Sequence, residues 1–411
     1  MSKQETSAVG PWLVVAMLWV VALLNYLDRL MLTTMRESLC ESIPMTDAQF
    51  GLLTSVFLWV YAILSPPAGY LADRFGRSRV IILSVLVWSA VTWLTTLAQS
   101  FTGLLIARAL MGISEACYLP AALALIADYH RGPTRSLATS VHITGLYVGS
   151  AMGGLGGVLA EHFGWRSGFT IFGVFGIAYA GFLACVLRDP PTAPTAKALE
   201  PGKSEQLGLL AGFLALLRQP SFLILLTIFS LFSIVNWGIL TWLPTYLQEA
   251  FHLGQGRAGL SATISNQIGS LAGILLGGFL ADRWSRTNVR GRLLVPLLGI
   301  CLAGPCLLFS TASSFLWLSL LGFALYGMGK SFGDANWMPI LCQIADPRYR
   351  ATGYGVMNLA SCLVGGGMAY LGGVLRDAQV ELGIVFQAFG LVYFAAGCMF
   401  LLIRPRRDLE A

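Results

Sequence analysis

The stretch GYLADRFGRSRV at residues 69–80 has a degenerate second copy later in the chain. That copy, GGFLADRWSRTNVRGR, occupies residues 277–292, and the LADR letters of the two copies stand 209 positions apart. A further pair follows in the same order, with ALIADYHRGPTRSLATS at 124–140 and CQIADPRYRATGYGVMN at 342–358. Two ordered matches at similar offsets predict a chain built from two related halves. Such internal repeats are typical of transporters with a site between the halves.

The composition points to a membrane. Of 411 residues, 56% are hydrophobic and 11% are charged, whereas soluble domains carry roughly 25% charged residues. A helix needs about 20 apolar residues to cross a bilayer. We predict twelve spans, at 12–36, 48–71, 79–98, 101–127, 136–160, 167–187, 221–247, 257–281, 292–311, 314–344, 351–375 and 381–403. The first is expected to remain as a span, because the polar MSKQETSAVGP start is not typical of a cleaved signal peptide.

The segment 188–220 is rich in Pro, Ala and charge, and it separates six spans from six spans. We therefore predict an N-terminal bundle at 1–187, a cytoplasmic linker at 188–220 and a C-terminal bundle at 221–411. Within the linker, Gln206 to Leu217 is expected to form an amphipathic helix at the membrane surface.

Charge sorts the loops into two sides. One side carries arginine clusters at 74–79, 131–135, 283–292, 348–350 and 404–407, and the other carries acids such as Glu37, Glu41, Asp47, Glu161 and Glu249. The positive-inside rule makes the first side cytoplasmic. Both termini are then expected in the cytoplasm of a multi-pass plasma-membrane protein, or at the inner membrane of a bacterium.

The repeated loop motif resembles that of the major facilitator superfamily, which reads roughly G-x-L-x-D-R-x-G-R. The resemblance covers almost the whole chain and implies an all-α integral membrane protein with twelve transmembrane helices in two six-helix bundles. The first copy matches at Gly69, Asp73, Arg74, Gly76 and Arg77, whereas the second keeps Asp282 and Arg283 but has Ser285 in place of the glycine.

A carboxylate such as Asp73, beside several arginines near a helix end, can form ion pairs and accept hydrogen bonds from a helix N-terminus. These residues are therefore a candidate cytoplasmic gate. The alternative is that they are loop charges that only set the topology.

Six charged residues lie deep within the predicted spans: Asp28 and Arg29, Arg108 and Glu115, and Lys330 and Asp334. They fall in spans one, four and ten, which in the resembled family line a central cavity. Intramembrane charges usually face a bundle interior or a watery cavity and pair with one another. A purely structural ion-pair network is the alternative, although buried pairs stabilise poorly compared with apolar packing.

The spacing of these residues suggests partners. Lys330 and Asp334 stand at i and i+4, where they can pair on one helix face. Adjacent residues point about 100° apart on a helix, so Asp28 and Arg29 should serve different partners, with Arg108 the expected partner of Asp28. Protonating Asp28 or Glu115 would free Arg29 or Arg108 for an anion, which gives symport; competition for one site would give antiport.

A narrower resemblance rests on NYLDR at 25–29 and on RALMGISEACYLP at 108–120. It is similar to the anion:cation symporters, which import sugar acids and other organic anions, and to bacterial spinster-like transporters, which are linked to lysolipids. In both groups the acids and arginine at these places are implicated in proton coupling. The resemblance says nothing of Lys330 and Asp334, whose role rests on physical argument alone.

Other polar or aromatic span residues are candidate substrate contacts: Tyr61, His142, Tyr147, Asn236, Trp237, Asn266, Gln267, Trp337 and Asn358. Interhelical hydrogen bonding is the alternative for each Asn or His. The eight cysteines show no CxxC or Cys/His spacing, which argues against a disulfide framework or a metal site.

The sequence thus favours a secondary transporter that works by alternating access. Proton-coupled transport of a small organic anion (a sugar acid, carboxylate or phosphorylated compound) is the leading hypothesis, and export of a lysolipid or drug-like amphiphile is the second. A lipid-facing gap between helices would favour the second hypothesis. No P-loop and no H-E-x-x-H motif occurs, which disfavours ATP drive and a membrane enzyme. We expect a proton gradient as the energy source and no cofactor. The expected partners are a small anionic substrate and the lipid bilayer, without nucleic acid, and the protein is expected to be a monomer.

Overall fold

The computed structural model describes residues 10–130, 134–190, 214–288, 290–345 and 349–403, without the side chains at 69, 70, 73, 136 and 351. The regular structure of these residues is helical. The first half of the chain forms α1 (Pro11–Thr34), α2 (Arg36–Ser42), α3 (Asp47–Phe75), α4 (Arg77–Leu94), the short 3₁₀ helix η1 (Thr95–Leu97), α5 (Phe101–Glu115), α6 (Tyr118–Tyr129), α7 (Arg135–Met152), α8 (Leu155–Phe163) and α9 (Trp165–Val186).

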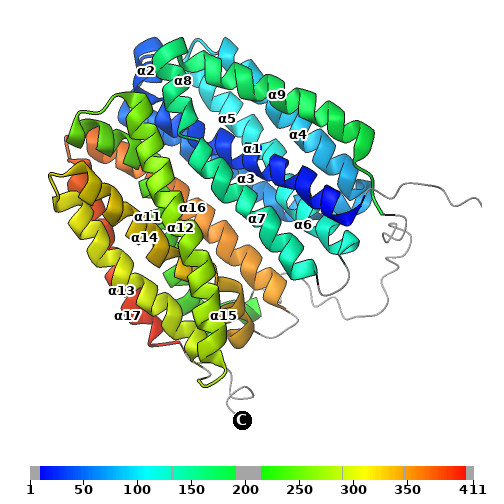
Figure 1. Cartoon of the computed structure of the whole chain (residues 1–411), viewed down its shortest axis with the longest axis vertical. Helices are drawn as coiled ribbons and strands as arrows, with labels where there is room; N and C mark the ends of the chain where they lie inside the picture. Colours follow the sequence, from blue (N-terminus) through cyan, green and yellow to red (C-terminus); the bar gives the residue numbers. More distant parts are fainter. Residues whose placement is uncertain (1–9, 131–133, 191–213, 289, 346–348, 404–411) are drawn as a thin grey trace, which may run out of the picture.

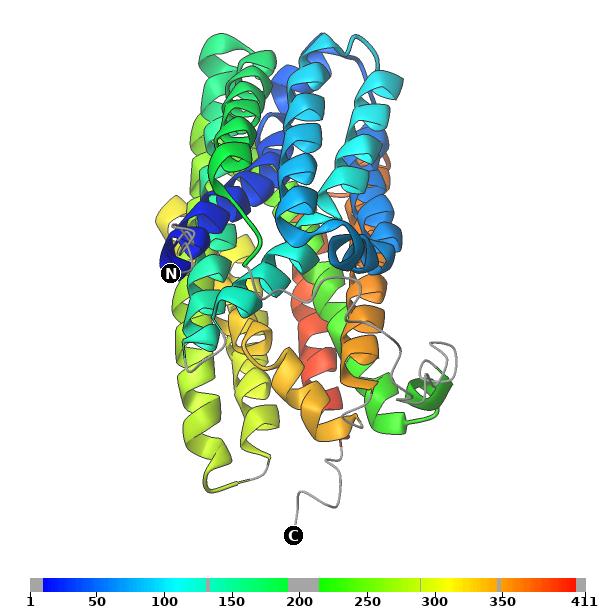
Figure 2. The same ribbon diagram turned by 90° about the vertical axis from the view of Figure 1, so that its right-hand side faces the viewer.

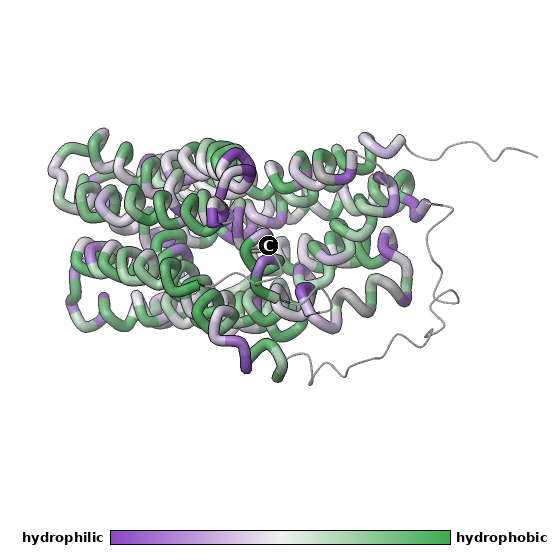
Figure 3. The backbone as a smooth tube through the Cα atoms, turned by 90° about the horizontal axis from the view of Figure 1, so that it is seen from below, coloured by the Kyte–Doolittle hydropathy of each residue, from purple (hydrophilic) through white to green (hydrophobic). Residues whose placement is uncertain are grey.

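The second half of the chain forms α11 (Pro220–Phe251), α12 (Gln255–Ser285), α13 (Gly291–Ala312), α14 (Leu316–Asp334), α15 (Trp337–Ile344), α16 (Arg350–Asp377) and α17 (Leu382–Phe400). In Figures 1 and 2 the helices of the two halves lie in two groups that meet along α3 and α16 and along α7, α8 and α12. Figure 3 shows that apolar positions run along most of each helix.

The predicted spans match the helices closely. In the described residues, eleven helical segments are long and apolar enough to cross a membrane. The expected tenth span, 314–344, is formed by α14 and α15, which are separated by a break at Ala335 and Asn336. Residues 191–213 of the predicted linker, and with them most of the predicted surface helix, lie outside the described residues. The short helix α2 was not expected.

Local sequence explains where the key helices begin. At the start of α3, the Thr46 hydroxyl accepts from the Gln49 backbone N–H at 3.2 Å, and the Gln49 side chain accepts from the Thr46 N–H at 3.0 Å. This capping box satisfies donors that a helix start leaves unpaired. Proline occupies the first position of α1 and of α11, where a missing N–H has no consequence.

Glycine sets the closest contacts between helices. A Cβ added at Gly149 in α7 would lie 2.1 Å from the Leu23 carbonyl oxygen of α1. A Cβ at Gly273 in α12 would lie 2.1 Å from the Met328 carbonyl oxygen of α14. Both contacts need a residue without a side chain, as membrane helix packing often does. The glycine-rich stretches at 149–157 and 365–373 include several more positions of this kind.

Replacing Gly273 by valine is expected to destabilise the fold, because the new side chain must push apart the backbones of α12 and α14. Overpacking of this kind costs about 1–3 kcal/mol or more. The melting temperature of the detergent-purified protein measures the effect. Gly278→Val is the control, since an added Cβ there meets nothing within 4 Å on the same helix. Equal melting temperatures for the two variants would contradict the packing argument.

Candidate functional site

The centre of the first half holds a buried ion pair between α1 and α5. Arg29 Nε lies 2.8 Å from Glu115 Oε2, and the Asn25 amide donates to the same oxygen at 2.8 Å. Arg29 is 5% exposed and Glu115 is fully buried. Asn25 and Arg29 stand one helical turn apart on α1, so they present donors to one carboxylate. The role of Asn25 was missed from the sequence, although its i, i+4 spacing to Arg29 was a usable signal.

Aromatic rings surround the Arg29 guanidinium. Its central carbon lies 4.8 Å from the ring centre of Tyr26, 4.9 Å from Phe57 and 4.6 Å from Tyr61. The guanidinium of Arg108 lies 4.7 Å from the same Phe57 ring. Ring faces attract cations within about 6 Å. The Phe57 side chain therefore contacts two guanidinium groups, which it also holds near each other.

The expected pair between Asp28 and Arg108 is not formed. Asp28 accepts a hydrogen bond of 3.4 Å from the Thr92 hydroxyl of α4, while Arg108 donates to the Leu53 carbonyl at 3.3 Å. The reason is direction along α1, because adjacent residues point about 100° apart. Arg29 points to α5 and Asp28 points to α4. The prediction that Asp28 and Arg29 have different partners is confirmed, but the partner of Asp28 is Thr92 and not Arg108.

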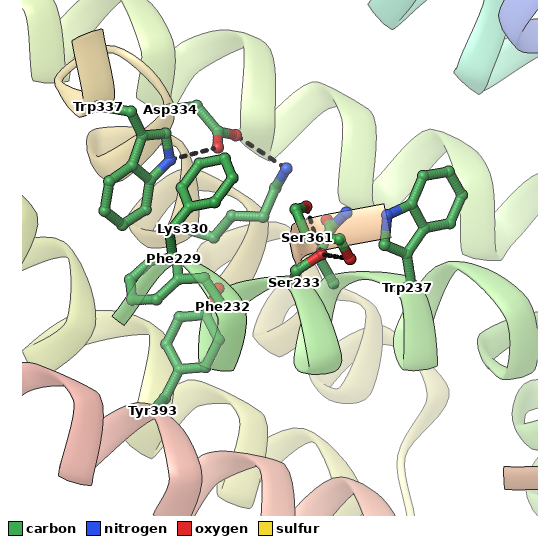
Figure 4. A pocket seen from close by; sticks show the side chains of 10 residues that line it. Phe229, Phe232, Ser233, Trp237, Lys330, Asp334, Trp337, Ser361 and Tyr393 are labelled. Atoms are coloured by element: carbon green, nitrogen blue, oxygen red, sulfur yellow. Dashed lines mark hydrogen bonds and ion pairs between the residues drawn. The ribbon is translucent and has the colours of Figure 1, made fainter. Parts of the chain in front are cut away.

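The charged residues Lys330 and Asp334 of α14 border a cavity in the second half of the chain. Lys330 Nζ lies 2.9 Å from Asp334 Oδ2, with side chains 12% and 30% exposed, so the predicted i, i+4 pair is present. The cavity has a volume of about 80 Å³. Figure 4 shows the pair beside its lining residues, which are Phe229, Phe232, Ser233, Asn236, Trp237, Lys330, Asp334, Trp337, Ser361 and Tyr393. Asn236, Trp237 and Trp337 are thus predicted contacts that line it.

Glu115 and Asp334 occupy related places in the two halves. Glu115 is the last residue of α5 and Asp334 the last of α14, and in each case a break precedes a short second helix. The sequences agree there: EACYLP at 115–120 and DANWMP at 334–339 share an acid, an alanine, an aromatic residue and a proline in register. This repeat was overlooked in the sequence, and it identifies Asp334 as the second-half counterpart of Glu115.

The remaining candidate contacts separate into groups. Tyr61 belongs to the Arg29 cage. His142 is fully buried beside Tyr118, with ring centres 6.0 Å apart, and Asn266 is buried against Gly327. Asn358 is half-buried on α16. None of these last three lines the cavity beside Lys330.

Tyr147 and Gln267 line a different cavity, of about 310 Å³, between α7, α8 and α12. Its lining is otherwise apolar and includes Leu155, Ile264 and Ile268. Ile268 is 64% exposed and Ile264 is 41% exposed, so the cavity reaches the side of the helix bundle. This surface lies where helices of the two halves meet.

The gate motif is partly visible. Arg77 pairs with Asp128 of α6 and donates to the Ala124 carbonyl at 2.9 Å. Gly76 has a φ of +90°, which lets the chain turn between α3 and α4. Gly69 and Asp73, by contrast, are residues whose side chains are not described.

Three other charges of the motif lie at this end. Arg74 is exposed and lies 5.6 Å from the Phe75 ring, Asp282 pairs with Arg292 at 3.5 Å, and Arg283 is exposed. Asp128 was missed from the sequence, although it lies in the repeated ALIADYHRG stretch. Asp189 was also missed, and it accepts from the backbone N–H and the hydroxyl of Ser78 at the start of α4, both at 2.9 Å.

The opposite end of the molecule, which we call the α2 end, is closed by bonds between the two halves. Arg376 of α16 donates to Asp47 at 3.0 Å and to both oxygens of Glu249 at 2.7 and 2.8 Å, while Arg36 pairs with Asp47. Gln255 of α12 donates to the Ser38 hydroxyl of α2 at 2.9 Å. These contacts hold the ends of helices from both halves together.

Two carboxylates at the α2 end cap helices of the other half. Asp377 accepts from the N–H groups of Asp47 and Ala48 at 2.9 and 3.0 Å, at the start of α3. Glu161 of α8 accepts from the Gly256 N–H at 2.6 Å, at the start of α12. A carboxylate at a helix N-terminus satisfies free donors and complements the helix dipole. The caps are reciprocal, because each half supplies one acid and one helix start.

Comparison with known proteins agrees with this architecture. The model of the Major Facilitator Superfamily matches residues 18–370 and 262–410. A protein described as spinster homolog 1, from Xenopus tropicalis, is 28% identical over 415 residues, covering 94% of this chain and 78% of that one. A probable galactarate/D-glucarate transporter, GudP from Bacillus subtilis, is 28% identical over 374 residues, covering 82% of this chain and 81% of that one.

A crystal structure also matches. It is that of a bacterial homolog of the human lysosomal transporter Spinster, in an inward-facing and unoccupied conformation. The TM-score is 0.80 at 23% identity, covering 98% of this chain and all of that one.

The chain belongs to the Major Facilitator Superfamily. It is a multi-pass membrane transporter with the fold of that family and is not an enzyme. The similarity predicted from the repeated LADR loop and from NYLDR is confirmed, including its extension to spinster-like proteins and to transporters of sugar acids.

Proposed function

We propose that the protein is a proton-coupled secondary transporter of a small organic anion. The observation that carries this proposal is the buried charge set of the first half. Arg29 is bonded to Glu115, whereas Asp28 and Arg108 have no ion-pair partner among the described residues. Uncompensated charges inside a membrane protein are costly. These four buried side chains, of which two form an ion pair and two do not, are therefore suited to exchanging ion-pair partners during a transport cycle.

The cycle follows from the contacts. A proton that adds to the Glu115 carboxylate removes the charge that holds Arg29 and leaves the buried charge set more positive, which favours the binding of an anion. Asp28 is a second candidate acceptor, because its buried carboxylate accepts a hydrogen bond of 3.4 Å from Thr92 and has no ion-pair partner among the described residues. Proton and anion then bind together, which is symport; the names of the galactarate/D-glucarate relatives support an anionic substrate.

The predicted orientation places the arginine-rich end and both termini in the cytoplasm. The conformation described above, bonded at the α2 end, is then closed toward the outside. In our proposal the loop motif around Asp73 and Asp282 serves as the opposite gate. A monomer in the plasma membrane, with bundles at 1–187 and 221–411 and a linker between them, is sufficient for this cycle.

The test is uptake into proteoliposomes under an imposed pH gradient. Accumulation of a small organic anion, found by testing a panel of sugar acids and monocarboxylates, is expected when the α2 side is acidic, and its loss is expected on collapsing the gradient with an ionophore. Asp28→Asn should lower gradient-driven accumulation by about tenfold, because the buried group can no longer take up a proton. Accumulation by this variant at the wild-type level, together with gradient-independent uptake by the wild type, would overturn proton coupling.

A second candidate function, transport of a lysolipid or another amphiphile, is favoured by one observation. The apolar cavity between α7, α8 and α12 reaches the side of the bundle through Ile264 and Ile268. An acyl chain could enter there from the lipid, and relatives include spinster homologs. Adding lysophospholipids to the uptake panel separates the candidates. If they are moved and organic anions are not, and if Ile268→Trp blocks that movement, the second candidate is correct.

A further inference from the structure

Of the two ion pairs described above, Arg29–Glu115 and Lys330–Asp334, the second borders the cavity shown in Figure 4 and the first does not. Arg29 is caged by three rings, and Arg108 is 1% exposed. A small molecule that enters this conformation can therefore reach the Lys330 ammonium more readily than either guanidinium.

Asp334 is held by contacts that do not all depend on Lys330. Its Oδ2 also accepts from the Ser331 hydroxyl at 3.3 Å, and its Oδ1 accepts from the Trp337 indole N–H at 3.4 Å. These neutral donors keep the side chain in place when its charge is removed. Lys330 has no such alternative, since Asp334 is the partner found for its ammonium in the described residues.

The cavity walls restrict the substrate. Phe229 and Phe232 meet the Trp337 ring edge to face, with ring centres 5.0 and 4.9 Å apart, and Tyr393 lies 4.5 Å from Phe232. Among the described residues of the lining, Lys330 is the one cation. One cation suits one carboxylate, and the aromatic walls suit a ring or a branched apolar body. The amide of Asn236, whose buried Oδ1 has no hydrogen-bond partner among the described residues, supplies a further polar contact.

We propose that Lys330 receives the carboxylate of the substrate when a proton neutralises Asp334, and that the substrate is a monocarboxylate with an aromatic or branched apolar body. This inference rests on the proposed function, which it deepens by naming the anion site and the substrate class. The proton comes from solution and adds to an Asp334 carboxylate oxygen. The ammonium then exchanges one carboxylate partner for another and keeps its charge.

Several tyrosines face Asp334 from neighbouring helices. Among the described residues, those within electrostatic range include Tyr26 of α1, Tyr147 of α7, Tyr354 of α16 and Tyr393 of α17. Tyr326 lies on α14 itself. Arg29 lies beyond Tyr26, where it is paired with Glu115. The charge that Asp334 faces directly is therefore that of Lys330.

Equilibrium binding tests this site without any gradient. Trp237 and Trp337 line the cavity, so their fluorescence in the detergent-purified full chain can report titration with 3-phenylpropanoate, glucarate and a lysophosphatidylglycerol. We expect 3-phenylpropanoate to bind best. Lys330→Gln should weaken its binding about tenfold, the scale of one charge-assisted hydrogen bond, and Lys330→Arg should recover part of the loss. Asp334→Asn should bind several-fold tighter, with less dependence on pH.

Arg257→Gln is the matched control, because it removes an exposed cation of α12 away from the cavity and should leave binding unchanged. Unchanged binding in Lys330→Gln, tighter binding of glucarate, or binding of the lysolipid alone would overturn the proposal, as would no binding of any of the three. The binding titration involves no gradient. If ligand binds as expected but the proteoliposomes show no gradient-driven uptake, the result contradicts proton coupling and leaves the proposed binding site standing.

Discussion

Replacing Glu115 by glutamine is expected to lower proton-driven accumulation about tenfold or more while leaving the protein folded. The glutamine amide oxygen can still accept from Arg29 and Asn25, so the 2.8 Å contacts have acceptable substitutes. The amide cannot take up a proton, and the buried guanidinium loses its counter-charge. Removing one partner of a buried pair costs about 3–5 kcal/mol. Glu115→Ala, which loses the hydrogen bonds as well, is expected to be much less stable.

The measurement compares two activities of the same proteoliposomes. Gradient-driven accumulation should fall about tenfold or more in Glu115→Gln, whereas exchange of labelled for unlabelled substrate should persist, because exchange needs no net proton movement. Glu381→Gln is the control, since Glu381 is an exposed carboxylate at the start of α17. If Glu115→Gln still accumulated substrate like the control, Glu115 would have no part in coupling.

Removing both reciprocal caps is expected to open the α2 end. Asp377→Asn and Glu161→Gln each weaken a carboxylate bond to the start of a helix in the other half. A lost cap of this kind costs about 1 kcal/mol, a factor of about five in the balance between closed and open forms. The double variant is therefore expected to shift that balance by roughly twentyfold to thirtyfold.

Cys40 of α2 reports this opening. Its thiol is half-buried near Arg36, Asp47 and Arg376, and burial raises its pKa, so it reacts slowly in the closed form. With the other cysteines replaced, labelling of Cys40 by a membrane-impermeant maleimide should be several-fold faster in each single variant and fastest in the double variant. Glu41→Gln, a nearby exposed carboxylate on α2, should label like the parent. Equal labelling rates throughout would show that the caps do not hold the end closed.

The helices were predictable because each membrane span needs a long apolar run, and such runs are visible residue by residue. The helix α2 was not predictable in this way. It is seven residues long and mostly polar, and its place depends on contacts such as that between Ser38 and Gln255, which lie far apart in the sequence. The break between α14 and α15 was also missed, although the polar residues Asp334 and Asn336 flank it.

The charged residues of the site were predictable, but most of their partners were not. Lys330 and Asp334 pair along one helix, so spacing alone gave the contact. Arg29 meets Glu115 across two helices, and the choice between Glu115 and other acids depends on how α1 is rotated. The same rotation turns Asp28 toward the hydroxyl of Thr92, and no sequence motif marks Thr92 as a partner. The EACYLP and DANWMP repeat was the available signal that was not used.

The Phe57 ring couples the energies of Arg29 and Arg108, which lie far apart in the sequence. Arg29 and Arg108 lie on different helices and share no hydrogen bond, yet each guanidinium rests on the same ring. If one guanidinium leaves, the ring and the electric field around it change for the other. The free-energy effects of replacing the two arginines should therefore not add. A change at Phe57 itself, a residue without any charge, would be felt by both cations at once.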